Sequence, residues 1–155
     1  MSDSKLISVL YVDDEAPNLS AFRANFRRNF NVHLADSAVK ALEIINSEDI
    51  DVVITDHMMP GRSGVDLLEQ LKTEHPYACR ILITGCSDIN IVIEAINRGE
   101  VFRFLTKPWV KGVLTNTIET GYYAMQEKKQ EQQLNSKLLE TNQQLEFMLR
   151  QKLIS

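Results

Sequence analysis

The chain has 155 residues, a formal net charge of −4 and hydrophobic residues at 44% of its positions. This length accommodates one ordinary domain with a hydrophobic core and leaves some chain over. The negative charge, without clustered Lys and Arg, argues against direct nucleic-acid binding. The N-terminus lacks a secretory signal, and no apolar run is long enough to span a membrane, so we expect a soluble, cytoplasmic protein. The two cysteines, Cys79 and Cys86, do not form a metal or redox motif.

Short apolar runs rich in β-branched residues alternate along the chain with segments of helical periodicity. The runs predict strands at residues 7–12, 31–35, 52–55, 80–84 and 101–105, and helices at 17–30, 36–47, 64–74 and 88–99. Asp36 is the expected cap of the second helix, and Gly99 is expected to close the fourth. This alternation predicts a parallel sheet covered by helices on both faces.

The expected helix at 88–99 is more apolar than one core-facing stripe requires. On a 3.6-residue period Ile89, Val92, Ile93 and Ile96 share a face, and we expect Ile91 to point away from it. Ile91 is then either an isolated surface residue or part of a dimer or partner surface.

The composition changes near Met125, after which seven of the eight glutamines occur, and neither Gly nor Pro follows Gly121. The segment after Met125 consists almost wholly of good helix formers, which predicts one long C-terminal helix. Leu138 and Leu145 lie one heptad apart, as in a coiled coil that would join two copies of the chain. A solvated tail is the alternative. Two series of partner positions are open: Leu134, Thr141 and Met148, or Asn135, Asn142 and Leu149.

Acidic residues follow two of the expected strands. The first strand ends on Asp13 and Asp14, and the third ends on Asp56. Ligands of an open parallel sheet gather beyond the carboxyl ends of its strands, so neighbouring strands would bring these carboxylates together. Their mutual repulsion favours a bound cation. Oxygen ligands suit Mg²⁺ or Mn²⁺ better than Zn²⁺, and the three histidines have no ligand spacing.

The fourth expected strand ends on Thr84, and the fifth ends close to Lys107. Taken singly, such residues are ordinary caps, turn residues or surface residues. A carboxylate, a cation, a hydroxyl and an ammonium at one sheet edge can together receive a phosphoryl group.

Four sequence blocks, "LYVDDE", "VVITDHMMPGRSG", "ILITG" and "FRFLTKPW", resemble the signature blocks of the receiver domain of bacterial two-component response regulators. The resemblance covers about residues 5–122. It implies a flavodoxin-like, doubly wound five-stranded sheet of order 2-1-3-4-5, with an extended C-terminal helix. We therefore expect a receiver domain at 1–124 and a helical linker, a possible coiled coil, at 125–155.

The resemblance also implies a phosphoacceptor and a metal site. Asp56 corresponds to the phosphoacceptor, and Asp14, Asp56 and the backbone carbonyl of Met58 to the Mg²⁺ ligands. Asp13 would support the metal through water. Met58 and Cys86 occupy positions whose side chains, in the family, flank the attacking water, and neither side chain can orient water strongly.

The remaining implied roles concern binding and switching. Thr84 and Lys107 would bind the phosphoryl group, and the Lys107–Pro108 peptide bond is expected to be cis. Phe104 corresponds to an aromatic switch that fills the space Thr84 leaves. The fourth-helix and fifth-strand face would then meet a partner.

The implied function is phosphoryl transfer from a histidine kinase or phosphotransfer protein to Asp56, which switches an output domain or partner protein. The chain itself is then not an enzyme, although it assists its own phosphorylation and dephosphorylation. One alternative is a pseudo-receiver that binds partners without phosphorylation. Another is a metal-dependent phosphatase, which needs a general acid beside the nucleophile, and His57 has no evident partner. We also expect the chain to be a fragment of a longer protein. The segment "RGEVFRFLTKPW", followed by a Gln-rich helix, resembles receivers attached to cyclic-dinucleotide signalling enzymes or to transcriptional activators.

Overall fold

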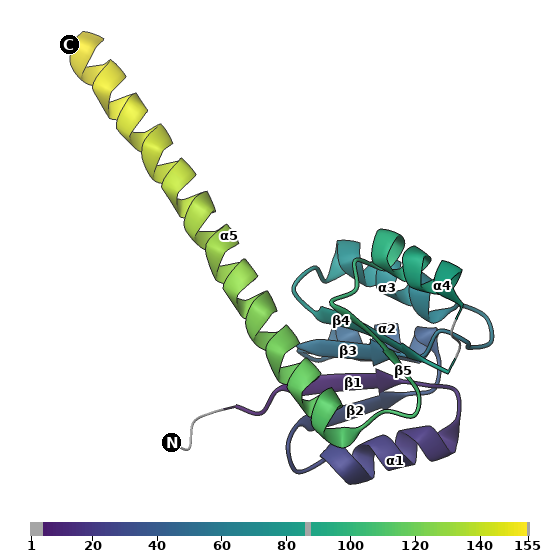
Figure 1. Ribbon diagram of the computed structural model, residues 1–155. Helices are drawn as coiled ribbons and strands as arrows, with labels where there is room; N and C mark the ends of the chain where they lie inside the picture. Colours follow the sequence, from purple (N-terminus) through teal and green to yellow (C-terminus); the bar gives the residue numbers. More distant parts are fainter. Residues whose placement is uncertain (1–4, 86–87, 155) are drawn as a thin grey trace.

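A single parallel sheet organises the computed structural model, which describes residues 5–85 and 88–154 (Figure 1). The strand order is β2-β1-β3-β4-β5, which confirms the predicted fold class and order. The central strands β1, β3 and β4 are buried along their whole length, which accounts for the lack of polar alternation in their sequences. The strands are β1 (Ser8–Val12), β2 (Asn31–Ala35), β3 (Val52–Thr55), β4 (Cys79–Thr84) and β5 (Arg103–Thr106), the last beginning two residues later than expected.

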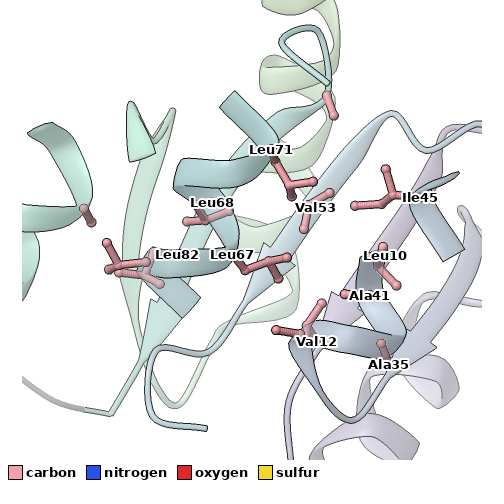
Figure 2. Packing of buried hydrophobic residues seen from close by; sticks show 14 residues of the cluster. Leu10, Val12, Ala35, Ala41, Ile45, Val53, Leu67, Leu68, Leu71 and Leu82 are labelled. Atoms are coloured by element: carbon pink, nitrogen blue, oxygen red, sulfur yellow. The ribbon is translucent and has the colours of Figure 1, made fainter. Parts of the chain in front are cut away.

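Helices cover both faces of the sheet (Figure 1). They are α1 (Ala16–Phe26), α2 (Ala38–Ser47), α3 (Gly64–Glu74), α4 (Ile89–Glu94) with the π-helical turn η1 (Ala95–Gly99), and α5 (Lys111–Ile154). α1 and α5 pack on one face, where Phe22 and Phe26 meet Leu114 and Ile118. The other face packs against α2, α3 and η1. Figure 2 shows this cluster, including Leu10, Val53, Leu67 and Leu82.

Side-chain caps fix where two of these helices begin. The Ser63 hydroxyl accepts from the Asp66 backbone N–H, and the Asp66 carboxylate accepts from the Ser63 N–H, which forms a capping box at the start of α3. α2 is capped by Ser37, whose hydroxyl accepts from the Lys40 N–H. The expectation that Asp36 caps α2 is wrong, because Asp36 lies one residue too early and its carboxylate instead faces the Lys40 ammonium.

The expected core face of α4 is also wrong. Ile89, Ile93 and Ile96 are 64%, 49% and 53% exposed, whereas Ile91 packs against the core. Ile91 is followed at four-residue intervals by two small buried residues, Ala95 and Gly99. A Cβ on Gly99 would lie 3.1 Å from Leu68 Cβ of α3, so the small residues allow a close approach. The π turn has more residues per turn than an α-helix, and it keeps this four-residue spacing on one face.

The C-terminal helix is continuous, as predicted. α5 spans 44 residues, and its C-terminal part projects away from the sheet (Figure 1). Its N-terminal part packs on the domain, and all residues from Glu127 to Ile154 are exposed. None of the described helices combines the length and hydropathy needed to cross a membrane.

Candidate functional site

The sheet's carboxyl edge brings together the polar residues that follow its strands. Val12 and Thr55 are register partners on β1 and β3, so Asp13 and Asp56 follow side by side. The backbone continues the ladder beyond the strand ends, because the Asp56 N–H donates to the Val12 carbonyl at 2.9 Å. Lys107 follows β5 in the same way, and its N–H donates to the Thr84 carbonyl at 3.0 Å.

Lys107 joins the two buried carboxylates. Its Nζ lies 2.8 Å from Asp13 Oδ2 and 3.0 Å from Asp56 Oδ2. Burial alone would lower the pKa of Lys107, but the hydrogen bonds and negative charges of Asp13 and Asp56 outweigh it and raise the pKa. The lysine therefore stays protonated and partly neutralises the pair.

The site retains an excess of negative charge. Oxygen atoms of Asp13, Asp14 and Asp56 all lie within 4.8 Å of one another, and Lys107 supplies one opposing charge. Three carboxylates against one ammonium leave two negative charges, which a divalent cation would balance. Asp14 is exposed, so a cation there could keep bound water, as Mg²⁺ does in proteins. The donor set therefore fits Mg²⁺.

The other residues singled out from the sequence lie around this edge. Thr84 is buried at the end of β4, and Phe104 is half-buried on β5 against the α3 side of the core. The Met58 side chain is 64% exposed. The predicted cis peptide bond between Lys107 and Pro108 is confirmed. Cys86 lies outside the described residues.

Gly64 fixes the loop that follows Asp56. A Cβ at this position would lie 2.1 Å from the Asp56 carbonyl oxygen, a distance that no side chain can occupy. The Gly64 N–H donates to the His57 carbonyl at 3.0 Å, which brings the start of α3 against the end of β3. Gly61, in the same loop, has φ of +82°, a conformation that favours glycine. The two glycines thus allow the tight return of the chain after the acidic residue.

Two site neighbours, Tyr11 and Asn18, did not emerge from the sequence. The Tyr11 hydroxyl and the Asn18 amide both donate to Asp13 Oδ2, at 3.2 and 3.0 Å. Strand alternation could have identified Tyr11, because it lies two residues before Asp13 and residues two apart along a strand point to the same face. Asn18 carries no comparable signal, since its role depends on how the first turn of α1 returns toward β1.

The fold and the edge together define a class. A parallel sheet of order 2-1-3-4-5 with helices on both faces is the flavodoxin-like doubly wound fold, whose ligands bind beyond the carboxyl ends of the strands. Residues 9–119 match the response regulator receiver domain, and the chain belongs to that family.

Known proteins with similar sequence or structure carry different outputs. The chain is 32% identical over 124 residues to the hydrogenase transcriptional regulatory protein HoxA of Cupriavidus necator, a match that covers 80% of this chain and 26% of HoxA. The signal receiver domain of an HD domain-containing protein from Pseudomonas fluorescens superposes with a TM-score of 0.77 at 28% identity, covering 79% of this chain and 99% of that one. An adenylate cyclase structure from Rhodopirellula baltica gives 0.77 at 29% identity, with 84% and 97% covered. This chain spans about a quarter of the length of curated relatives such as HoxA.

Proposed function

We propose that Asp56 accepts a phosphoryl group from the phosphohistidine of a histidine kinase or phosphotransfer protein. The observation that carries this proposal is the position of Asp56, which is 7% exposed and directly follows β3. Its carboxylate lies 3.0 Å from an ammonium within an acidic cluster. A carboxylate oxygen would attack phosphorus in line. The new O–P bond forms as the P–N bond breaks, and the bonding electrons leave with the imidazole, which takes up a proton.

The surrounding residues have distinct proposed roles. Asp14, Asp56 and the backbone carbonyl of Met58 would hold Mg²⁺, and Asp13 would act through water. The ion when bound supplies positive charge to the phosphoryl oxygens. Lys107 would exchange its bond to Asp13 for one to a phosphoryl oxygen, and the Thr84 hydroxyl would donate to another. This arrangement makes the chain a phosphoacceptor that assists its own reaction.

A small-molecule phosphodonor tests the assignment. Acetyl phosphate with MgCl₂ should add one hydroxylamine-labile phosphoryl group, and Asp56→Asn should abolish the gain with an unchanged circular dichroism spectrum. Asp36→Asn, an exposed change outside the acidic cluster, is the matched control and should label fully. Full labelling of Asp56→Asn would contradict the proposal. An unlabelled wild-type chain would favour a pseudo-receiver, and continuous release of phosphate from phosphomonoesters would favour a hydrolase.

The proposed output surface lies on α4 and η1. Thr84 moving toward the phosphoryl group would open space that Phe104 can fill, and this would shift an equilibrium of the α4 and β5 region. Ile89, Ile93 and Ile96 are exposed on this region, which supports a partner-facing role. Phosphorylation would then change how accessible these three isoleucines are to a partner.

We further propose that the chain divides into a receiver domain at 1–124 and a helical linker at 125–155 that pairs with a second copy. The exposed Leu138 and Leu145, one heptad apart on a continuous helix, support this pairing. The output domain or partner is a transcriptional regulator or a signalling enzyme, as in the relatives named above.

A further inference from the structure

Tyr11 reaches from the hydrophobic core into the acidic cluster. It is fully buried near the C-terminal end of β1, where its ring stacks on Phe22 with centroids 4.4 Å apart and an interplanar angle of 7°. Its hydroxyl donates to Asp13 Oδ2 at 3.2 Å. Packing alone needs only the ring, so the hydroxyl provides something that a phenylalanine would not.

Asp13 is held by four donors. Its Oδ2 accepts from Tyr11, from Asn18 at 3.0 Å and from Lys107 at 2.8 Å, and its Oδ1 accepts from the Glu15 N–H at 3.0 Å. These donors differ in how firmly they are fixed. Tyr11 is immobilised by burial and stacking, whereas Lys107 also binds Asp56 and is the donor that the proposed function diverts to a phosphoryl group.

The Tyr11 hydroxyl is a constant donor. Its ring is held by burial and by stacking on Phe22, so the hydroxyl keeps its place beside Asp13 Oδ2. An ionised carboxylate only accepts hydrogen bonds, so the phenol is the donor and Asp13 is the acceptor.

We propose that Tyr11 is a positioning residue that holds the Asp13 carboxylate toward the cation site, both while Lys107 binds Asp13 and after Lys107 has turned away. This inference rests on the proposed function for the cation site. Groups that orient a carboxylate beside a metal influence the affinity of the site for that metal, even when they do not touch the ion.

Tyr11→Phe removes the hydroxyl and keeps the stacked ring. Calorimetric titration of the full chain with MgCl₂, without phosphodonor, should show a dissociation constant raised about tenfold, at the low end of outer-ligand effects because Asn18 remains. Tyr123→Phe is the matched control, since Tyr123 lies exposed on α5, and its dissociation constant should equal that of the wild type. Asn18→Ala should also weaken binding, and the double variant should weaken it further.

A second readout separates positioning from general structural damage. With acetyl phosphate, Tyr11→Phe should raise the MgCl₂ concentration for half-maximal labelling of Asp56 and leave the rate at saturating MgCl₂ nearly unchanged. A stability loss without a change in Mg²⁺ affinity would overturn the inference, as would tighter binding or a loss confined to the saturated rate. Unchanged Mg²⁺ affinity in Tyr11→Phe would overturn it as well, whatever the effect of Asn18→Ala.

The two proposals can fail separately. A wild-type chain that binds Mg²⁺ in a Tyr11-dependent way but takes no phosphate on Asp56 would sustain this inference and overturn the proposed function. Labelling of Asp56 with Tyr11-independent Mg²⁺ binding would do the reverse. A wild-type chain that binds no Mg²⁺ would overturn the role of Tyr11 directly.

Discussion

The guanidinium of Arg98 lies 2.7 Å from the carboxylate of Asp66, which joins the π turn η1 to the start of α3. Arg98 also pairs with Glu69 at 3.0 Å and contacts Glu94 on α4. Asp66 belongs to the capping box with Ser63, so one carboxylate secures both the first turn of α3 and the position of η1. This cluster fixes the α4 region beside the exposed isoleucines.

Replacing Arg98 should make stability depend on pH in a defined way. Its hydrogen bonds lower the pKa of Asp66 and of Glu69. A carboxyl group whose pKa is lowered by folding adds stability above its unfolded pKa of about 4, and this stability is lost as the pH falls through the folded value. Arg98→Met should therefore reduce the urea midpoint at pH 7, and the difference from the wild type should shrink below about pH 4.

Lys40→Met is the control for that experiment. Lys40 and Asp36 are both exposed, and their charged atoms lie 3.5 Å apart, a contact that contributes little to stability. The urea midpoint of Lys40→Met should match that of the wild type at pH 7 and at pH 3.5. A constant difference for Arg98→Met at every pH would show that the arginine acts through packing of its aliphatic stem and not through its charge.

Gly64→Ala should damage the site through the backbone. The new Cβ would meet the Asp56 carbonyl oxygen at 2.1 Å, so either α3 or the end of β3 must shift. Overpacking commonly costs about 1–3 kcal/mol, and a backbone clash should reach or exceed the upper value. Thermal or urea unfolding measures this, and the rate of Asp56 labelling should fall as well.

Gly112→Ala provides the opposite expectation. Gly112 lies in the first turn of α5, and a Cβ there meets nothing within 4 Å. Alanine favours helix by up to about 1 kcal/mol over glycine, so this variant should be as stable as the wild type or more so. Equal stability of the two alanine variants would mean that the Gly64 loop can relax.

The strand-end residues were predictable because strand termini are marked in the sequence by apolar runs that stop on acids. Parallel topology then requires Asp13 and Asp56 to meet at one edge. The core face of α4 was not predictable in this way. Periodicity alone selects the larger apolar stripe, yet α4 and η1 pack a partly buried Ile91 and the buried Ala95 and Gly99 on the core side, since close packing on α3 favours small side chains.

Hydrogen bonds between distant segments could also not be predicted from the sequence. Arg98 and Asp66 are 32 residues apart, and each has an ordinary surface composition around it. Arg80 is buried in β4 and donates to the Gly99 and Ala78 carbonyls. The sequence shows only an apolar run interrupted by one arginine, which does not indicate these acceptors. Such contacts depend on where helices lie on the sheet, which periodicity does not specify.

Met58 should set a long lifetime for the phosphorylated chain. Its exposed thioether, two residues beyond Asp56, cannot orient an attacking water strongly. Met58→Asn places an amide there, and the decay of labelled Asp56 after donor removal should become about tenfold faster, which corresponds to about 1.4 kcal/mol of barrier. Met58→Leu keeps an apolar side chain and should decay at the wild-type rate. Unchanged or slower decay in Met58→Asn would contradict this role.

The exposed leucines of α5 should mediate dimerisation. At about 1.5 Å per residue the helix extends roughly 65 Å, and Leu138 and Leu145 are 54% and 53% exposed along it. Leu138→Asn combined with Leu145→Asn should convert a sedimenting dimer to a monomer and leave Asp56 labelling intact. Phe147→Ser, on the opposite side of the helix, is the control and should remain dimeric. Identical monomers in all samples, with and without beryllofluoride, would leave the helix as a solvated linker.

The register of the pair is testable with two further substitutions. The series through Leu134 and Met148 contains one polar position, Thr141, whereas the series through Leu149 contains two asparagines, so we expect the first. Thr141→Leu should then lower the dimer dissociation constant at least about tenfold, because each buried leucine contributes about 1.5–3 kcal/mol. Asn142→Leu should have little effect, since that position would lie at the edge of the seam. Sedimentation equilibrium measures both, and tightening by Asn142→Leu alone would establish the second series.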